Sequence, residues 1–168
     1  YQVDEGEVFY SQLHQHKEIQ ISIILSGEGD LIVGDSISRY EKDDIVVFGS
    51  QLPHLFKSDE SVSEKSHMLT LFFSKDSFGH DFFDLVELKE LESFFQKSEM
   101  GIRLTSLKKE IKDLFLMLDG SGKLEQMIYF FQILNKILKA ETSSLSTFIY
   151  DRVYTEDEGT RMNNVMNH

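Results

Sequence analysis

The feature that most constrains the fold of this chain is a change in hydrophobic periodicity near Phe78. Before Phe78 the apolar residues stand in short runs typical of strands, and after it they recur every three or four residues, as in amphipathic helices. Short strands separated by Gly, Asp and Ser turns are typical of a sandwich or barrel. The sequence therefore predicts an α+β chain, mainly β, in which a small antiparallel barrel precedes a helical segment.

The strand-like runs lie at 19–25, 31–33, 37–40, 45–48 and 68–73. Gly34-Asp35 between two of them is a two-residue hairpin signal. Pro53, the single proline, stands just before His54, as expected at the start of a strand.

Three helices are predicted after Phe78. The first runs over Asp84–Gln96 with Gly101 as a stop shortly past its end, and Thr105 or Ser106 caps the second. The third follows the break at 120–122 and runs from about Leu124 to Ala140.

The apolar stripe of the third predicted helix is wider than one face, so we expect a second partner besides the barrel, namely a second copy of the chain. The predicted dimerisation residues are Leu124, Met127, Ile128, Phe131, Leu134 and Leu138. The alternative is that this stripe packs entirely inside the monomer.

Composition narrows the classes of function. The 168 residues carry a formal charge of −12 and no cysteine, and no apolar run approaches the roughly 18 residues of a membrane span. Disulfides and thiolate chemistry are excluded, a cytoplasmic location is the simpler expectation, and no membrane partner is expected. A surface with this negative charge repels the phosphate backbone of nucleic acids. We therefore do not expect these residues to bind nucleic acid themselves. The start at Tyr1 suggests a trimmed chain.

Three histidines are the candidate site. His14 and His16 would share one face of a strand, Glu18 and Gln20 have the same parity, and His54 follows on a second strand. Two histidines at i and i+2 with a distant third form a reasonable three-nitrogen metal set. We expect these side chains to line an enclosed pocket in the barrel.

At these residues the sequence resembles the cupin superfamily. The first cupin motif, His-x-His, an acid and a later Gly, reads His14, His16, Gln20 and Gly27 here, and His54 matches the second motif. The departures are Gln20 at the acid position and Gly49 and Gln51 at the Pro and Gly of the second motif. The resemblance implies a jelly-roll barrel.

A narrower resemblance is to the sensor domain of AraC-type transcription regulators. It is carried by the segments 14–18, 25–29, 33–35, 43–46, 52–54, 78–82, 101–104 and 161–166. It implies a barrel for the effector over 1–78, a helical dimerisation segment over 79–142, and a linker with the start of a DNA-binding domain over 143–168. A bacterial regulator of this kind would be a homodimer and would contact DNA only through helix-turn-helix units absent from this chain.

The resemblance implies a small-molecule effector, for instance a sugar, and no catalytic residues. The predicted ligand-binding residues are His14, His16, Glu18, Gln20, Phe48, His54 and Phe56. No cofactor is expected; a divalent metal, if bound, would use His14, His16, Gln20 and His54, although losing the carboxylate weakens such a site. Two alternatives stay open: a metal-dependent cupin enzyme of isomerase or dioxygenase type, and a ligand-free dimerisation domain.

Overall fold

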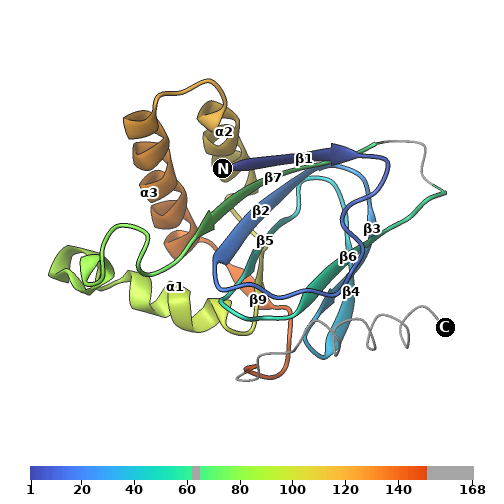
Figure 1. Cartoon of the computed structure of the whole chain (residues 1–168), viewed down its shortest axis with the longest axis horizontal. Coiled ribbons are helices and arrows are strands. Elements are labelled where there is room, and N and C mark those ends of the chain that lie inside the picture. Colours follow the sequence, from blue (N-terminus) through green and yellow to red (C-terminus); the bar gives the residue numbers. More distant parts are fainter. Residues whose placement is uncertain (62–64, 151–168) are drawn as a thin grey trace.

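The structure, a computed structural model, describes residues 1–61 and 65–150 and contains two antiparallel sheets. The larger sheet has the strand order β1-β7-β2-β5-β8-β9, and the smaller has the order β4-β3-β6. The two sheets face each other and form the walls of the barrel (Figure 1). The strands are β1 (Gln2–Gly6), β2 (Ile19–Ser26), β3 (Gly29–Val33), β4 (Ser36–Tyr40), β5 (Ile45–Phe48), β6 (His54–Ser58), β7 (Ser66–Phe73), β8 (Ile102–Leu104) and β9 (Thr142–Ser144).

Strand β2 lies between two hydrophobic cores because its side chains alternate between the faces of the large sheet. Its odd-numbered isoleucines, such as Ile21 and Ile23, belong to a core shared with the helices. Its even-numbered Ile24 belongs to a second core inside the barrel, together with Phe48 and Phe56. The helices therefore cover the outer face of this sheet, and the barrel interior lies on its inner face.

The helical part contains α1 (Leu91–Ser98), α2 (Lys108–Leu118) and α3 (Lys123–Lys139). All three lie on one side of the barrel (Figure 1). Three helices were predicted, and the third agrees within a residue at each end. In the described residues, no helix has the length and apolar character needed to cross a membrane.

Two details of the first and second helices were predicted wrongly. The segment from Phe82 to Leu88 forms two short 3-10 turns, Phe82–Asp84 and Val86–Leu88, because the backbone of Leu85 between them is extended. The first α-helix therefore begins only at Leu91. The second helix begins after Leu107, which adopts the left-handed conformation, and no side chain caps it. The hydroxyl of Ser106 instead accepts a hydrogen bond from the amide of Glu141, at 2.8 Å.

Strands β1, β8 and β9 were not predicted. Strand β1 pairs with β7, and β8 pairs with both β5 and β9. The residues 102–104 and 142–144 therefore belong to the same sheet as the strands before position 78. The sheet joins segments on both sides of the boundary predicted at 78, so the barrel is not built from the first 78 residues alone.

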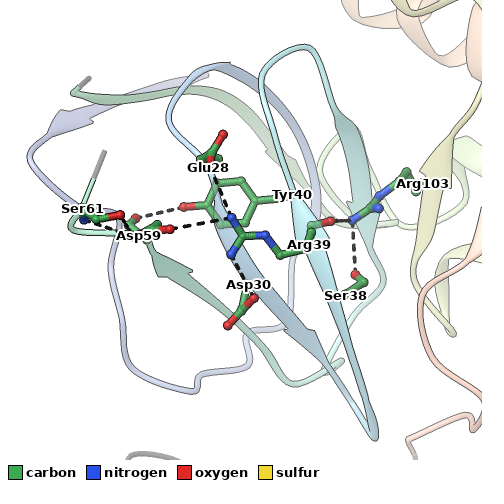
Figure 2. Close-up of polar contacts among 9 residues, drawn as sticks. Glu28, Asp30, Ser38, Arg39, Tyr40, Asp59, Ser61 and Arg103 are labelled. Carbon is green, nitrogen blue, oxygen red and sulfur yellow. Dashed lines mark hydrogen bonds and ion pairs between the residues drawn. The ribbon is translucent and has the colours of Figure 1, made fainter. Parts of the chain in front are cut away.

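Charged side chains connect the strands of the small sheet to one another and to the large sheet. Arg39 on β4 lies 3.3 Å from Asp30 and 3.4 Å from Glu28, both on or beside β3 (Figure 2). Arg103 on β8 donates to Ser38 and to the backbone oxygen of Arg39, which links β8 of the large sheet to β4 of the small sheet. Exposed pairs of this kind contribute on the order of 1 kcal/mol or less each, so the two cores dominate stability.

Candidate functional site

Three histidine side chains meet at one end of the barrel, near the first residues of β2 and β6. One ring nitrogen each of His14, His16 and His54 lies within 4.8 Å of the others. His54 is buried, with 1% of its surface exposed, and the other two are half-buried. The cluster therefore has a buried base and a more open side.

The backbone brings these residues together without a regular strand at 14–18. His14 makes an isolated bridge with His54, in which each amide donates to the other's carbonyl at 3.2 and 2.9 Å. The carbonyl of His16 accepts from the amide of Gln51 at 2.8 Å. The prediction that both histidines share a strand with Gln20 is therefore wrong, because β2 begins only at Ile19. The antiparallel bridge between His14 and the first residue of β6, not strand parity, makes the side chains converge.

Each imidazole is fixed by a backbone carbonyl two residues away in the sequence. The Nδ1 atoms of His14, His16 and His54 lie 2.8 Å from the carbonyl oxygens of residues 12, 18 and 52. A carbonyl oxygen can only accept, so each Nδ1 must carry the proton in a neutral ring. Each Nε2 then presents a lone pair. The same arrangement orients the histidine ligands of metal sites.

Gln20 joins two of the rings from the barrel interior. One terminal atom of its amide lies 3.1 Å from Nε2 of His16 and 3.1 Å from Nε2 of His54, and the other lies 2.8 Å from the hydroxyl of Ser22. A half-turn of the amide exchanges its two atoms, and the hydrogen-bond network decides between them. With lone pairs on both Nε2 atoms, the NH₂ group donates to the rings and the carbonyl accepts from Ser22. The Ser22 hydroxyl in turn lies 2.8 Å from that of Thr70.

Burial favours the neutral form of His54 and of His14. Desolvation, followed by the nearby ring of His14, holds the pKa of His54 well below its ordinary value. Desolvation also lowers the pKa of His14, with a further contribution from His16. Neutral imidazoles retain the lone pairs that accept hydrogen bonds or bind a metal ion.

Aromatic rings surround the histidines. Phe48 stacks on His54 with ring centres 4.2 Å apart, and Phe72 meets His16 edge-on at 5.4 Å. Tyr10 meets His14 edge-on at 5.1 Å. Tyr10 was not predicted at the site, because its segment shows no periodicity that would place it there. Its only sequence signal is its aromatic character four residues before His14.

Two predicted ligand-binding residues lie apart from the Nε2 atoms. Phe56 packs against Phe48, Tyr40 and Phe9 in the core beneath the site. Glu18 has its carboxylate 3.8 Å from Nδ1 of His16, on the far side of that ring from Nε2. The aromatic core fills the barrel under the histidines, so the site lies at the mouth of the barrel. The sequence analysis predicted that the histidines line an enclosed pocket in the barrel. In the structure they lie at its mouth, above the aromatic core.

Two cavities lie elsewhere in the molecule, and no histidine lines either of them. A cavity of about 450 Å³ lies on the outer side of the small sheet, beside Arg39, Lys57 and Asp59. A cavity of about 330 Å³ lies between the barrel, α1 and the segment at 149–150, beside Lys17 and Phe95.

The donor set at the histidines fits a divalent transition metal. Three neutral imidazoles with converging Nε2 atoms and with Nδ1 held by carbonyls form a typical nitrogen ligand set. With a metal ion bound, the Gln20 amide would turn its oxygen towards the ion, and this oxygen would be a fourth ligand atom. No carboxylate reaches the Nε2 atoms among the described residues, so the set suits Zn²⁺ or a similar borderline ion and not Ca²⁺ or Mg²⁺.

The predicted dimerisation residues on α3 divide into exposed and buried groups. Leu124 is 71% exposed and Ile128 is 48% exposed, whereas Met127, Phe131 and Leu138 are half-buried. Leu134 is 1% exposed, because it packs in the core between α3 and the large sheet. Leu134 is therefore a core residue and does not belong to a surface available to a partner.

Comparisons with known proteins agree with this architecture. Residues 1–68 match the family model described as a cupin domain. The barrel has the cupin fold. The predicted jelly-roll barrel with about three helices is confirmed. No curated protein matched this chain.

Two solved structures resemble the cupin barrel together with its helices. ToxT from Vibrio cholerae, an AraC-family regulator, is 14% identical over 91% of this chain and 60% of ToxT, with a TM-score of 0.50. ToxT from Vibrio cholerae O395 bound to (E)-4-(8-methylnaphthalen-1-yl)but-3-enoic acid is 15% identical over 89% of this chain and 60% of ToxT, with a TM-score of 0.53. This chain thus spans about 60% of the length of ToxT. The fold predicted from the resemblance to AraC-type sensor domains is confirmed.

A variant of oxalate decarboxylase from Bacillus subtilis is 25% identical over 42% of this chain and 19% of that protein. Its TM-score is 0.33, which is too low to support an argument about this chain.

Proposed function

We propose that this chain is the effector-sensing and dimerisation part of an AraC-type transcription regulator. A small molecule would bind at the mouth of the cupin barrel and control a DNA-binding domain carried by the rest of the protein. The fold shared with ToxT over both the barrel and the helices supports the general sensor role. A non-enzymatic function is part of this proposal.

The observation that carries the proposal is the convergence of three imidazole lone pairs beside a buried amide. The backbone fixes the directions of the three Nε2 acceptors. Gln20 donates to those of His16 and His54, and a ligand hydroxyl can take its place. A few polar groups with fixed directions beside aromatic rings are typical of small-molecule sites.

A neutral, hydroxyl-rich molecule such as a sugar suits this chemistry. Hydroxyl groups can donate to Nε2 of His14 and can replace the Gln20 amide as donors to His16 and His54. The exposed ring of Tyr10 offers an apolar face. The ligand named for ToxT is a carboxylic acid with a naphthalene group. A carboxylate would find no fixed cation among the neutral imidazoles here, so we favour the neutral class.

Binding of candidate sugars and carboxylic acids to the chelator-treated chain tests the ligand site. His16→Ala should weaken binding at least about tenfold, because it removes one acceptor and one contact of Gln20. His80→Ala is the matched control, because His80 lies exposed and pairs only with Asp76 among the described residues. Equal binding by the two variants would contradict the proposed site.

The larger claim is tested by the gene. A reading frame that continues beyond His168 into two helix-turn-helix units would support the regulator. A stop codon at that point would refute it.

We further propose that α3 forms the dimer contact through its exposed residues. Leu124→Asp combined with Ile128→Asp should yield soluble monomer in sedimentation equilibrium. The matched control is Val86→Asp, which changes an apolar residue that is 77% exposed and lies outside α3. An unchanged mass in the α3 variant would place the interface elsewhere.

A metal-dependent cupin enzyme is the second candidate. The three Nδ1–carbonyl contacts favour it, because they prepare the rings as metal ligands. A bound divalent ion would supply Lewis-acid chemistry at the mouth of the barrel. Stoichiometric iron, manganese or zinc in protein purified without chelator would support this candidate, and its absence would remove the basis for it.

A further inference from the structure

The turn between β3 and β4 holds a segment of the chain more than a hundred residues away. The carboxylate of Asp35 in this turn accepts hydrogen bonds from the hydroxyl of Ser146 at 2.8 Å and the amide of Thr147 at 3.0 Å. It also accepts a short hydrogen bond from the hydroxyl of Thr147. We call residues 145–150 the exit segment, because they are the last described residues of the chain. Asp35 is their main polar anchor to the barrel.

The exit segment has further contacts that set its position. The amides of Leu145 and Ser146 each donate, at 2.9 Å, to the carbonyls of Gly101 and Met100. The side chain of Leu145 is buried in the barrel core. The segment is thus packed at its beginning, and Asp35 holds the residues that follow.

The same turn also contacts the histidine site. The amide of Gly34 donates to the carbonyl of Pro53 at 2.8 Å, and Pro53 directly precedes His54. In the β3–β6 pairing, Val33 stands opposite His54. A movement of His54 therefore acts on the backbone of the turn by two routes: the hydrogen bond between Gly34 and Pro53, and the pairing of His54 with Val33.

Gly34 shows how closely the turn and the exit segment approach. Its φ of +55° is rarely adopted by residues with a side chain. A Cβ at this position would also collide with the ring of Tyr150 and the hydroxyl of Ser146. Both the backbone conformation and the contact with the exit segment therefore require glycine.

Hydrogen bonds keep the Asp35 carboxylate charged. Those from the side chain and the amide of Thr147, followed by smaller contributions from Ser146 and Ser36, hold its pKa well below the ordinary range. The carboxylate therefore stays ionised at any physiological pH, and its acceptor role does not depend on protonation.

We propose that the Gly34-Asp35 turn transmits occupancy of the histidine site to the exit segment. An occupant that holds His54 fixes Pro53 and the turn, and so stabilises the Asp35 contacts with Ser146 and Thr147. Loss of the occupant shifts the population towards a released exit segment. This inference rests on the proposed function, since it describes how binding in the barrel would reach the part of the protein that follows.

Amide hydrogen exchange on the full chain tests the proposal, with Zn²⁺ as the occupant because three Nε2 donors can chelate it. Calorimetry first measures Zn²⁺ binding. Saturating Zn²⁺ should then slow exchange at Ser146 and Thr147 at least about threefold.

The variant Asp35→Ala should speed exchange at these two amides about tenfold, because a charged acceptor is lost. It should also abolish the response to Zn²⁺ while Zn²⁺ still binds. Asp30→Ala is the matched control, since Asp30 is a β3 carboxylate that pairs with Arg39.

The outcomes separate the two proposals. Zn²⁺ binding without slower exchange at Ser146 and Thr147, or with the same response in Asp35→Ala, overturns the transmission through the turn and leaves the binding site intact. Failure of Zn²⁺ and of the sugars and acids to bind would overturn the proposed site.

If nothing binds, the transmission through the turn is tested without an occupant by the substitution His54→Asn. The substitution should speed exchange at Thr147 in the wild-type background but not in Asp35→Ala, after normalisation to amides in α3. Equal effects in both backgrounds overturn the proposal.

Discussion

The two faces of β2 differ in chemistry although they lie on one strand. On the outer face, Ile19, Ile21 and Ile23 pack against a core that includes the helices. On the inner face, Gln20 and Ser22 form a hydrogen-bonded line from the histidines to Thr70. The outer face thus supplies burial, and the inner face supplies directed polar groups at the mouth of the barrel.

This contrast shows how a small barrel accommodates a polar site. Buried polar groups cost free energy unless each finds a partner, and the line from His54 through Gln20 to Thr70 provides those partners. The helices on the outer face add the apolar burial that offsets the cost. The following substitutions test whether stability and binding divide between the faces in this way.

The largest effect is expected on the outer face. Phe115→Ala in α2 removes a fully buried ring from the core shared with the helices and should lower the free energy of unfolding by about 3–5 kcal/mol. Urea denaturation measures the change. Leu116→Ala, the exposed neighbour, should change stability by no more than about 0.5 kcal/mol. Similar losses in both variants would contradict a shared core.

The next effect is expected on binding at the inner face. Gln20→Glu should raise Zn²⁺ affinity about tenfold, because it adds a negative charge beside three neutral imidazoles. Gln20→Leu, of similar size but without a donor atom, should not gain affinity. Calorimetry at one pH compares the variants, and equal affinities for Glu and Leu would show that the charge at position 20 does not matter.

A smaller effect is expected deeper on the inner face. Thr70→Val removes the hydrogen bond to Ser22 and should cost about 1 kcal/mol of stability. Ile23→Val on the outer face should cost a similar amount, about 0.5–1.5 kcal/mol. Only the Thr70 variant should also weaken Zn²⁺ binding, by less than the Gln20 substitutions change it. A binding defect in Ile23→Val would break the proposed division between the faces.

The smallest effect concerns Asp35 and pH. Because the folded pKa of Asp35 lies below its ordinary value of 3.8, its stabilising contribution is fully present above that value and is lost as pH falls through the folded pKa. The stability difference between wild type and Asp35→Ala should therefore be constant from pH 8 to about 5 and shrink only below about 4. Thermal unfolding across this range measures it. A difference that disappears already at pH 6 would contradict the hydrogen-bonded carboxylate.

Local patterns were enough to predict most of the elements. The isoleucine-rich run at 19–25 and the turn at Gly34-Asp35 became β2 and the β3–β4 hairpin. The short strands β8 and β9 were not predicted, because three residues show no periodicity and pair only after α2 and α3 have folded back. The cap of the second helix was predicted wrongly, because Ser106 hydrogen-bonds Glu141, a residue far along the chain. The predicted start of a DNA-binding domain at 161–166 lies outside the described residues.

By itself, the sequence determined the alternation of strands and helices, because periodicity is a local property of the chain. It also determined which residue types are available at the mouth of the barrel, including the neutral Gln20 in place of an acid. Only the tertiary structure decided that His14 bridges His54, that each Nδ1 meets a carbonyl, and that Leu134 is buried while Leu124 is exposed. These facts depend on pairs of segments far apart in the sequence, and their geometry is fixed only when both cores have packed.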